Sequence, residues 1–475
     1  MKRETETLLH YFEKSKILEN NVREQLYKSL LVSEIDMNLA LISLRILLEK
    51  VLRSYIKKNV PSSDPFNLFD MLNIAEKEQL IDKKIINNLH RARLDGNECA
   101  HVGELGGLDF NSTFLCSIQV LEWIEEKDFD YVVGIDVGST KISGALAKIS
   151  SSNNIELICE QTIHESARYK EKPNDLVRAI SNLIDKLLKH TSQISGVSHE
   201  YFTSLGLGLP GQVDVHKEDL IFSPGLQISF FPLKERLMQL LRGKELTKQI
   251  REVIVCNDVK CGTIAEILIG NGKAYSNFIS IYIGTGVSSG IVVDRKLLEG
   301  NDNIAGECGH MIIKYDAEHK CKCGRKGCLE SYISGYAIKS RFDELYEKHK
   351  ENFLKYDQSL EDKDNDPVRS IPIMVNKGCK PAARITDEMA EYLGIGLANL
   401  ANLYNPEAIL LGGGIIKGYY DIVIDKAMKC FDNLTLSRKI EIGEVKFVTQ
   451  GPMYGACLLP KYYRTVSKAE QKRHA

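Results

Sequence analysis

The segment 306–330 of this chain, GECGHMIIKYDAEHKCKCGRKGCLE, gathers side chains that could bind a metal ion. Three of its four thiols, those of Cys321, Cys323 and Cys328, are clustered, and the segment also carries two imidazoles, His310 and His319. Three thiolates and one imidazole close the tetrahedral shell of Zn²⁺ and leave no open position for a catalytic water. The segment therefore predicts a structural zinc site, with His310 or His319 as the fourth ligand.

Three glycine-rich turns, each placed after an apolar strand, could bind phosphate. They read DVGSTK at 136–141, IGTGVSSG at 283–290 and LGGGI at 411–415. Glycine lets the main chain point its N–H groups at a phosphate, and a carboxylate at a strand end can hold Mg²⁺ through water. One such turn is as often an ordinary hairpin, but three in one region favour phosphate binding. The candidates are Asp136, Gly138, Ser139, Thr140, Lys141, Gly284, Thr285, Gly286, Gly413 and Gly414.

The pair Asn257-Asp258 follows the apolar stretch EVIVC. A carboxylate at the end of a strand can act as a general base for a hydroxyl group that attacks a phosphate. The alternative is that Asp258 caps the helix that starts near Val259, which by itself is the commoner role of such an aspartate.

The elements that must position these residues differ between the two parts of the chain. Residues 1–128 show helical periodicity, with Leu41, Leu44, Leu48, Val51 and Tyr55 along one face of a predicted helix. From Tyr131 onwards, short apolar strands alternate with helical segments, which predicts an α/β protein. The sequence therefore predicts a helical domain at 1–128 and an α/β domain at 129–475.

Composition excludes some classes of function. The chain of 475 residues has 62 basic and 64 acidic side chains, a net charge of −2, so no global field attracts nucleic acid or an anionic membrane. No apolar stretch approaches the roughly 20 residues that span a bilayer. Nine of the twelve cysteines are scattered singly, as in a reducing compartment, so we expect a cytoplasmic protein.

With these motifs in place, residues 131–460 resemble the ROK family, named for repressors, open reading frames and kinases. The matching elements are DVGSTK, GLGLPGQVD at 206–214, ND at 257–258, the GTG turn, GECGH at 306–310, CKCGRKGCLE at 321–330 and NPEAILLGGG at 405–414. The resemblance implies an actin-like ATPase (ribonuclease H-like) fold with two lobes. It also implies transfer of phosphate from ATP, with Mg²⁺, to a sugar, and a dimer.

The resemblance also implies roles for single residues. Asp258 matches the catalytic base and Asn257 its sugar-binding neighbour, while Glu307, His310 and Glu330 match side chains that bind sugar hydroxyls. His310 with the three cysteines matches the zinc site. As a ligand, His310 would tie the knuckle, the cysteine-bearing segment 321–328, back to the GECGH turn. We therefore prefer His310 to His319 as the fourth ligand.

The chain departs from the family pattern in two places. A Pro-Asn-Leu segment followed by a tryptophan lies near the sugar in family kinases, but here Gly225 replaces the asparagine and the single tryptophan is Trp123. These losses put the identity of the sugar in doubt. Ser139 and Ser288-Ser289 replace glycines of the phosphate loops, and serine can still donate to phosphate.

Residues 36–104 are similar to helical modules of the HEPN type. Acidic residues outnumber basic ones in residues 1–128, which disfavours nucleic-acid binding. Nucleases of that superfamily use an arginine and a histidine at close spacing, whereas here Arg93 lies too far from His101 for the tight form of the motif. The favoured interpretation is a dimerising or partner-binding module.

Three hypotheses of function follow. The first is an ATP-dependent kinase of a hexose or an N-acetylhexosamine, such as glucose or N-acetylmannosamine. The second is a sugar- or nucleotide-sensing regulator whose ROK-like part controls the helical module. The third is a ribonuclease effector, which would require His101 and Arg93 for cleavage.

Overall fold

The structure, a computed structural model, describes residues 20–33, 36–60, 65, 67–78, 81, 83–102, 110–138, 141–150, 153–163, 166–194, 197–214, 217–362, 366–437 and 439–474. The chain divides into two compact units, residues 1–130 and 131–475. Each unit has a hydrophobic core of its own. Among the residues described, none of the helices combines the length and the apolar character needed to cross a membrane.

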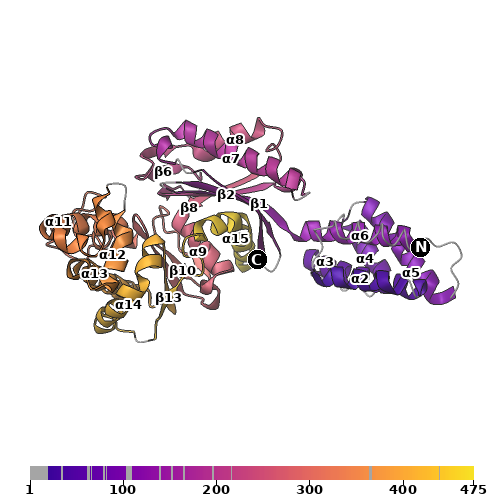
Figure 1. The fold of residues 1–475 in the computed structure, drawn as a ribbon. Helices are drawn as coiled ribbons and strands as arrows, with labels where there is room; N and C mark the ends of the chain where they lie inside the picture. Colours follow the sequence, from indigo (N-terminus) through magenta and orange to yellow (C-terminus); the bar gives the residue numbers. More distant parts are fainter. Residues whose placement is uncertain are drawn as a thin grey trace. The chain divides into compact units, whose positions relative to one another are not determined.

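The first unit is helical throughout the part described (Figure 1). Its helices are α2 (Asn20–Ser33), α3 (Met37–Asn59), α4 (Leu68–Lys77), α5 (Lys83–Val102) and α6 (Phe110–Asp128). Helix α3 is capped by Asp36, whose side chain accepts hydrogen bonds from the N–H groups of Asn38 and Leu39. Such a cap satisfies main-chain donors that have no partner inside the helix.

The apolar face predicted for α3 is buried. Leu41, Leu44 and Leu48 form part of the core of the first unit, and Leu52 and Ile56 continue this buried face. Leu52 and Ile56 each lie one position after a residue predicted for this face, Val51 and Tyr55. The reason is that a buried face follows the contacts of neighbouring helices as well as the helical period.

The second unit contains two five-stranded sheets and one three-stranded sheet. Sheet A has the spatial order β3 (Ile155–Ile163), β2 (Ile142–Ile149), β1 (Asp130–Val137), β4 (Ser204–Leu209) and β8 (Glu252–Asn257). Sheet C has the order β11 (Lys296–Leu297), β10 (Val287–Val293), β9 (Phe278–Ile283), β12 (Ala408–Gly412) and β13 (Glu441–Glu444). Sheet B is formed by β5 (Gln212–Val213), β6 (Leu220–Ser223) and β7 (Ile228–Phe231).

Sheets A and C repeat one arrangement. Counted by appearance along the chain, the strands of both sheets lie in the order 3-2-1-4-5. Strands β1, β4 and β8 are parallel, as are β9, β12 and β13, while β2 with β3 and β9 with β10 are antiparallel. The duplicated arrangement is the two-lobed, ribonuclease H-like architecture of actin-like ATPases, so the predicted fold class is confirmed.

Helices cover the sheets on their outer faces and fill the space between them (Figure 1). Helices α7 (Pro173–Ile194) and α8 (Leu233–Arg242) pack on sheet A. The outer cluster of sheet C includes side chains of α11 (Gly335–Leu354), α12 (Pro367–Asn376), α13 (Lys380–Tyr404) and α14 (Gly414–Leu434). The short helices are α10 (Glu330–Ile333), η1 (Ser166–Tyr169), η2 (His199–Tyr201), η3 (Asn271–Ala274), η4 (Cys308–His310) and η5 (Gln358–Glu361).

Helices α9 (Asp258–Leu268) and α15 (Gly451–His474) join the two lobes. One buried cluster contains Val132 of sheet A, Phe278 and Ala408 of sheet C, Cys261 of α9 and Cys457 of α15. Because the two sheets share this core, strand ends from both lobes are held around the start of α9.

Candidate functional site

Two carboxylates lie at the same edge of sheet A. Asp136 stands near the end of β1 and Asp258 directly after β8, and β4 runs between these strands. Gly208 of β4 pairs with Asp136 on one side and with Cys256 on the other. A Cβ atom on Gly208 would lie 3.7 Å from both Asp136 Oδ1 and Asp258 Cα. The missing side chain of Gly208 therefore leaves the two carboxylates close together.

Both carboxyl groups have raised pKa values, because they lie close together and have limited contact with water. Burial raises the pKa of Asp258 to about 7, and the charge of Asp136 is the next largest cause. Burial also raises the pKa of Asp136 to about 6, although Lys141 partly opposes this shift. A carboxylate whose pKa lies near neutrality matches the requirement for a general base at neutral pH.

The structure assigns the helix cap to Asn257. Its Oδ1 accepts a hydrogen bond of 3.1 Å from the N–H of Lys260, and its Nδ2 donates one of 3.1 Å to the Gly211 carbonyl. The capping role considered for Asp258 is therefore filled by its neighbour, while Asp258 Oδ1 accepts a hydrogen bond of 2.8 Å from the N–H of Val259. The predicted contact of Asn257 with a sugar would have to coexist with these two hydrogen bonds.

The first glycine turn is a hairpin, closed by a hydrogen bond of 2.8 Å from the Gly138 N–H to the Lys141 carbonyl. Lys141 is exposed, and the predicted Ser139 and Thr140 lie outside the described residues. A turn between two antiparallel strands can also present N–H groups to an anion, so the hairpin interpretation does not conflict with phosphate binding.

The other two glycine turns meet at one edge of sheet C. They follow β9 and β12, which are parallel neighbours with Tyr282 opposite Gly412. Thr285 and Gly286 are exposed, and Gly284 N donates to Gly286 O at 2.9 Å. Gly413 has a φ of 95°, and a Cβ there would lie 2.4 Å from the Ile283 carbonyl oxygen, so this approach of the two strand ends requires glycine. Gly414 begins α14 and is exposed.

Glu307 follows a tightly held glycine. Gly306 has a φ of 96°, and its carbonyl accepts hydrogen bonds of 2.8 Å from both the N–H and the Oγ of Ser289. Ser289, predicted as a phosphate donor, therefore uses its hydroxyl within the protein. Glu307 itself is exposed, and desolvation by the surrounding groups raises its pKa while His310 and Lys260 lower it. Its charge also raises the pKa of Asp258.

Glu330 connects the cysteine segment with the second glycine turn. Its Oε2 accepts a hydrogen bond of 2.9 Å from the N–H of Val287, directly after Gly286. Its Oε1 lies 3.5 Å from Cys321 Sγ and 3.5 Å from Tyr336 Oη. The Glu330 side chain is buried, so its predicted role in sugar binding would have to be compatible with these internal contacts.

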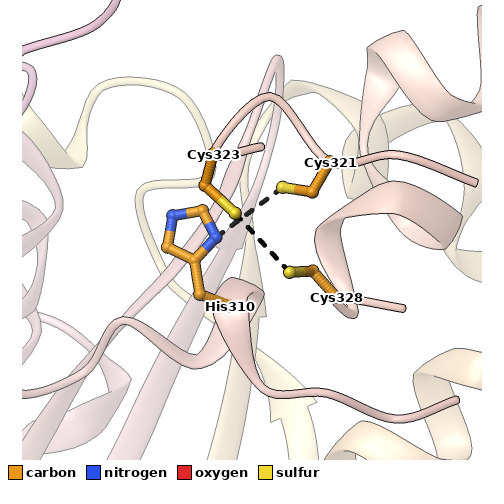
Figure 2. A group of neighbouring side chains, drawn as sticks. All are labelled: His310, Cys321, Cys323 and Cys328. Atoms are coloured by element: carbon orange, nitrogen blue, oxygen red, sulfur yellow. Dashed lines mark hydrogen bonds between the residues drawn. The ribbon is translucent and has the colours of Figure 1, made fainter. Parts of the chain in front are cut away.

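The candidate zinc ligands converge, as Figure 2 shows. The three sulfur atoms and one ring nitrogen of His310 all lie within 4.8 Å of one another. Cys323 Sγ is 3.7 Å from Cys328 Sγ, and Cys321 Sγ is 3.8 Å from His310 Nδ1. Zn–S bonds of about 2.3 Å in a tetrahedron separate two ligand atoms by about 3.8 Å. The donor set and the two short separations therefore fit a tetrahedral Zn²⁺ site.

His319 lies away from this group. Its Nδ1 is 3.0 Å from a guanidinium nitrogen of Arg341, and its ring packs edge-on against Tyr332 with the centroids 5.7 Å apart. This geometry favours His310 as the fourth ligand.

The candidate nuclease residues of the first unit are described only in part. The Arg93 guanidinium lies 5.4 Å from the centroid of the Phe69 ring, while the side chain of His101 lies outside the described residues. Trp123 packs edge-on against Tyr55 with a centroid distance of 5.8 Å, as part of the core of the first unit.

The sequence analysis missed Lys260 and Asn303. Both are buried polar residues next to the site, 3% and 8% exposed. One signal was available, because Lys260 is a charged residue in the otherwise largely apolar helix DVKCGTIAEIL. Nothing in the sequence around Asn303 distinguishes it from an ordinary loop asparagine.

Comparison with known proteins identifies relatives of the second unit. The family model described as ROK family matches residues 132–462. A glucokinase of Halalkalibacterium halodurans is 30% identical over 327 residues, which make up 68% of this chain and 91% of that protein. A xylose repressor of Caldicellulosiruptor bescii is 29% identical over 286 residues, 60% of this chain and 66% of that protein.

A similar fold is found among solved structures. The ROK family glucokinase from Streptomyces griseus, in complex with glucose and AMPPNP, is 25% identical and superposes with a TM-score of 0.56. The superposition covers 69% of this chain and 98% of that chain.

Proposed function

The chain belongs to the ROK family, and from this premise we propose that it is an ATP-dependent sugar kinase. The acceptor is a hexose or an N-acetylhexosamine. The observation that carries the proposal is the pair Asp136 and Asp258 at the ends of two strands of sheet A, where a Cβ on Gly208 would lie 3.7 Å from both residues. A base and a candidate magnesium-binding carboxylate at one edge are the groups that phosphoryl transfer requires.

The division of roles follows from the position of each group. Asp258 takes the proton of the attacking sugar hydroxyl, and Glu307 holds the sugar by a second hydroxyl. Asp136 would hold Mg²⁺ through water, which would neutralise charge on the phosphates of ATP. The N–H groups of the turns at 136–141, 283–290 and 411–415 orient the phosphates and the adenosine side.

The zinc in this proposal is structural. His310 and the three cysteines would hold it, and their shared coordination would fix the knuckle 321–328 against the segment that carries Glu307. With four protein ligands it has no position for substrate, so Asp258 remains the group that moves a proton.

Phosphoryl transfer to a panel of sugars tests the proposal. The full chain, loaded with zinc, is incubated with ATP, Mg²⁺ and glucose, mannose, N-acetylglucosamine or N-acetylmannosamine, and ADP release is measured against a reaction without sugar. At least one sugar should stimulate ADP release and yield a sugar phosphate. Absence of a sugar phosphate across the panel would contradict the kinase assignment.

The pH dependence should show the titration of Asp258. Because burial raises its pKa to about 7, the carboxyl is protonated below that pH and cannot accept the hydroxyl proton. We expect kcat/KM for the sugar to rise with pH and level off above about 7, with a steeper loss below about 6, where Asp136 also becomes protonated. A profile that stays flat from pH 8 down to about pH 5 would rule out a base with this pKa.

A second candidate function has support from two observations. The xylose repressor of Caldicellulosiruptor bescii aligns with 60% of the chain, and both polar atoms of Asn257 already have partners in the protein. We therefore also propose a sugar-sensing regulator in which the second unit acts on the helical first unit. Saturable sugar binding without a sugar phosphate would favour this alternative over the kinase.

A further inference from the structure

Lys260 occupies a position that is unfavourable for a lysine. It lies in the first turn of α9, two residues after Asp258, and its side chain is 3% exposed. Removal from water destabilises an ammonium ion, and a cation in the first turn opposes the dipole of its helix. Such a residue indicates that the ammonium group makes contacts that an apolar side chain could not make.

The ammonium group binds one loop of the other lobe. Lys260 Nζ donates to the Asn303 carbonyl at 2.8 Å, to Asn303 Oδ1 at a still shorter distance, and to the Glu299 carbonyl at 3.5 Å. Each of its three N–H groups thus has an oxygen acceptor. Asn303 adopts the left-handed conformation, with a φ of 56°, which asparagine tolerates better than most residues. Lys260 therefore holds the loop that leads into Gly306 and Glu307.

Asn303 also contacts the lobe that contains sheet A and β5. Its Nδ2 donates to the Val213 carbonyl in β5 at 3.0 Å, and beside it Gln212 Nε2 donates to the Asp302 carbonyl at 3.0 Å. Both ends of the Asn303 amide are used in this way, because its oxygen accepts from Lys260 and its nitrogen donates to β5. One buried side chain thereby links α9 and sheet B through the loop at 299–303.

These contacts close into a ring around the candidate base. Gly211, two residues before Val213, accepts from Asn257 Nδ2 at 3.1 Å, and Asn257 Oδ1 accepts from the N–H of Lys260 at 3.1 Å. The ring runs from Asn257 to Lys260, to Asn303, to Val213 and back through Gly211. Asp258 lies within its shortest segment, between Asn257 and Lys260.

We propose that Lys260 is a positioning residue that holds the Glu307 loop and β5 at a fixed place relative to Asp258, so that the acceptor sugar is bound with its hydroxyl on the base. This inference rests on the proposed kinase function and deepens it. Lys260 acts through the loop and makes no contact with substrate in this role. None of the ring residues belongs to the glycine turns, so the effect concerns the acceptor sugar and not ATP.

The first test replaces Lys260 by methionine, which keeps the length of the side chain and removes the donors. KM for the best sugar of the panel should rise about tenfold or more, while KM for ATP should change less than about twofold, because displacement of a binding group by about 1 Å weakens productive binding strongly. The variant Asn303→Asp separates the two halves of the ring. It keeps an oxygen for Lys260 and removes the donor to Val213, so a smaller rise in sugar KM is expected.

The matched control is Lys446→Met. Lys446 Nζ donates to the Ile269 carbonyl at 3.1 Å, which is the same kind of contact at the opposite end of α9. This variant should leave both KM values unchanged. If Lys260→Met raised the KM values for sugar and ATP by the same factor, Lys260 would have a general structural role and the proposal would be wrong.

A measurement without substrate keeps this proposal separate from the kinase assignment. Hydrogen–deuterium exchange in the segments 211–213 and 299–307 should become faster in Lys260→Met and Asn303→Asp, and not in Lys446→Met. If the wild-type protein phosphorylated no sugar, the proposed function would fail while the exchange data still tested the ring. Unchanged exchange and unchanged sugar KM in a folded Lys260→Met variant would overturn the positioning role.

Discussion

Replacing Asp258 by asparagine should lower kcat by about a hundredfold to ten-thousandfold, the range expected when a general base is lost. The asparagine keeps the size of the side chain and an oxygen for the N–H of Val259. Helix α9 should remain intact because Asn257, and not Asp258, caps it. The substitution therefore removes the basic oxygen and little else, so KM for sugar and ATP should change much less than kcat.

Steady-state kinetics of Asp258→Asn with the best sugar of the panel would check this expectation. The matched control is Asp343→Asn, which makes the same chemical change at an exposed aspartate paired with Lys339. Its kcat should equal that of the wild type. The residual activity of Asp258→Asn should also lose its dependence on a group with a pKa of about 7. Wild-type turnover in the Asp258→Asn variant would remove Asp258 from the role of base.

Replacing Cys328 by serine should release the zinc and weaken sugar binding. Cys328 is fully buried and its sulfur lies 3.7 Å from that of Cys323, so a serine there would remove one of the four ligands from the centre of the group. Without the ion, His310 is no longer held to the knuckle, and Glu307, three residues earlier, loses its support. We expect less than one zinc per chain, a lower melting temperature and a sugar KM raised about tenfold or more.

His319, the alternative candidate for the fourth zinc ligand, provides the control for this experiment. His319→Ala removes an imidazole from the same segment but one that contacts Arg341 and Tyr332. It should retain the zinc measured by elemental analysis and a sugar KM close to that of the wild type. Loss of zinc in His319→Ala would contradict the ligand set. A chelated wild-type protein with unchanged sugar KM would contradict the structural role of the metal.

The fold could be predicted because its signals are local. The α/β class followed from strand and helix periodicity after Tyr131, and its two-lobed form from the ordered ROK motifs, and both are confirmed. The helical pattern before residue 128 likewise corresponds to helices in the part of the chain that is described. Such patterns survive because each element buries one face against its neighbours, whatever the details of the contacts.

The internal contacts of the site could not be predicted in the same way. Lys260 and Asn303 are 43 residues apart, as are Val287 and Glu330, so their hydrogen bonds depend on tertiary packing and leave no local pattern. The assignment of the helix cap shows the same limit. Asn257 and Asp258 are both good capping residues, and only the main-chain geometry at the end of β8 decides between them.

Glu330 has a consequence for the binding of the proposed zinc ion and of the nucleotide. One carboxylate contacts Cys321 at the zinc knuckle through Oε1 and the N–H of Val287 at the second glycine turn through Oε2. If this bridge transmits strain, zinc and nucleotide are thermodynamically linked, and linkage acts equally in both directions. The factor by which bound zinc raises the affinity for ATP is then the factor by which bound ATP raises the affinity for zinc. The protein with bound nucleotide would therefore lose zinc to a chelator less readily than the protein without nucleotide.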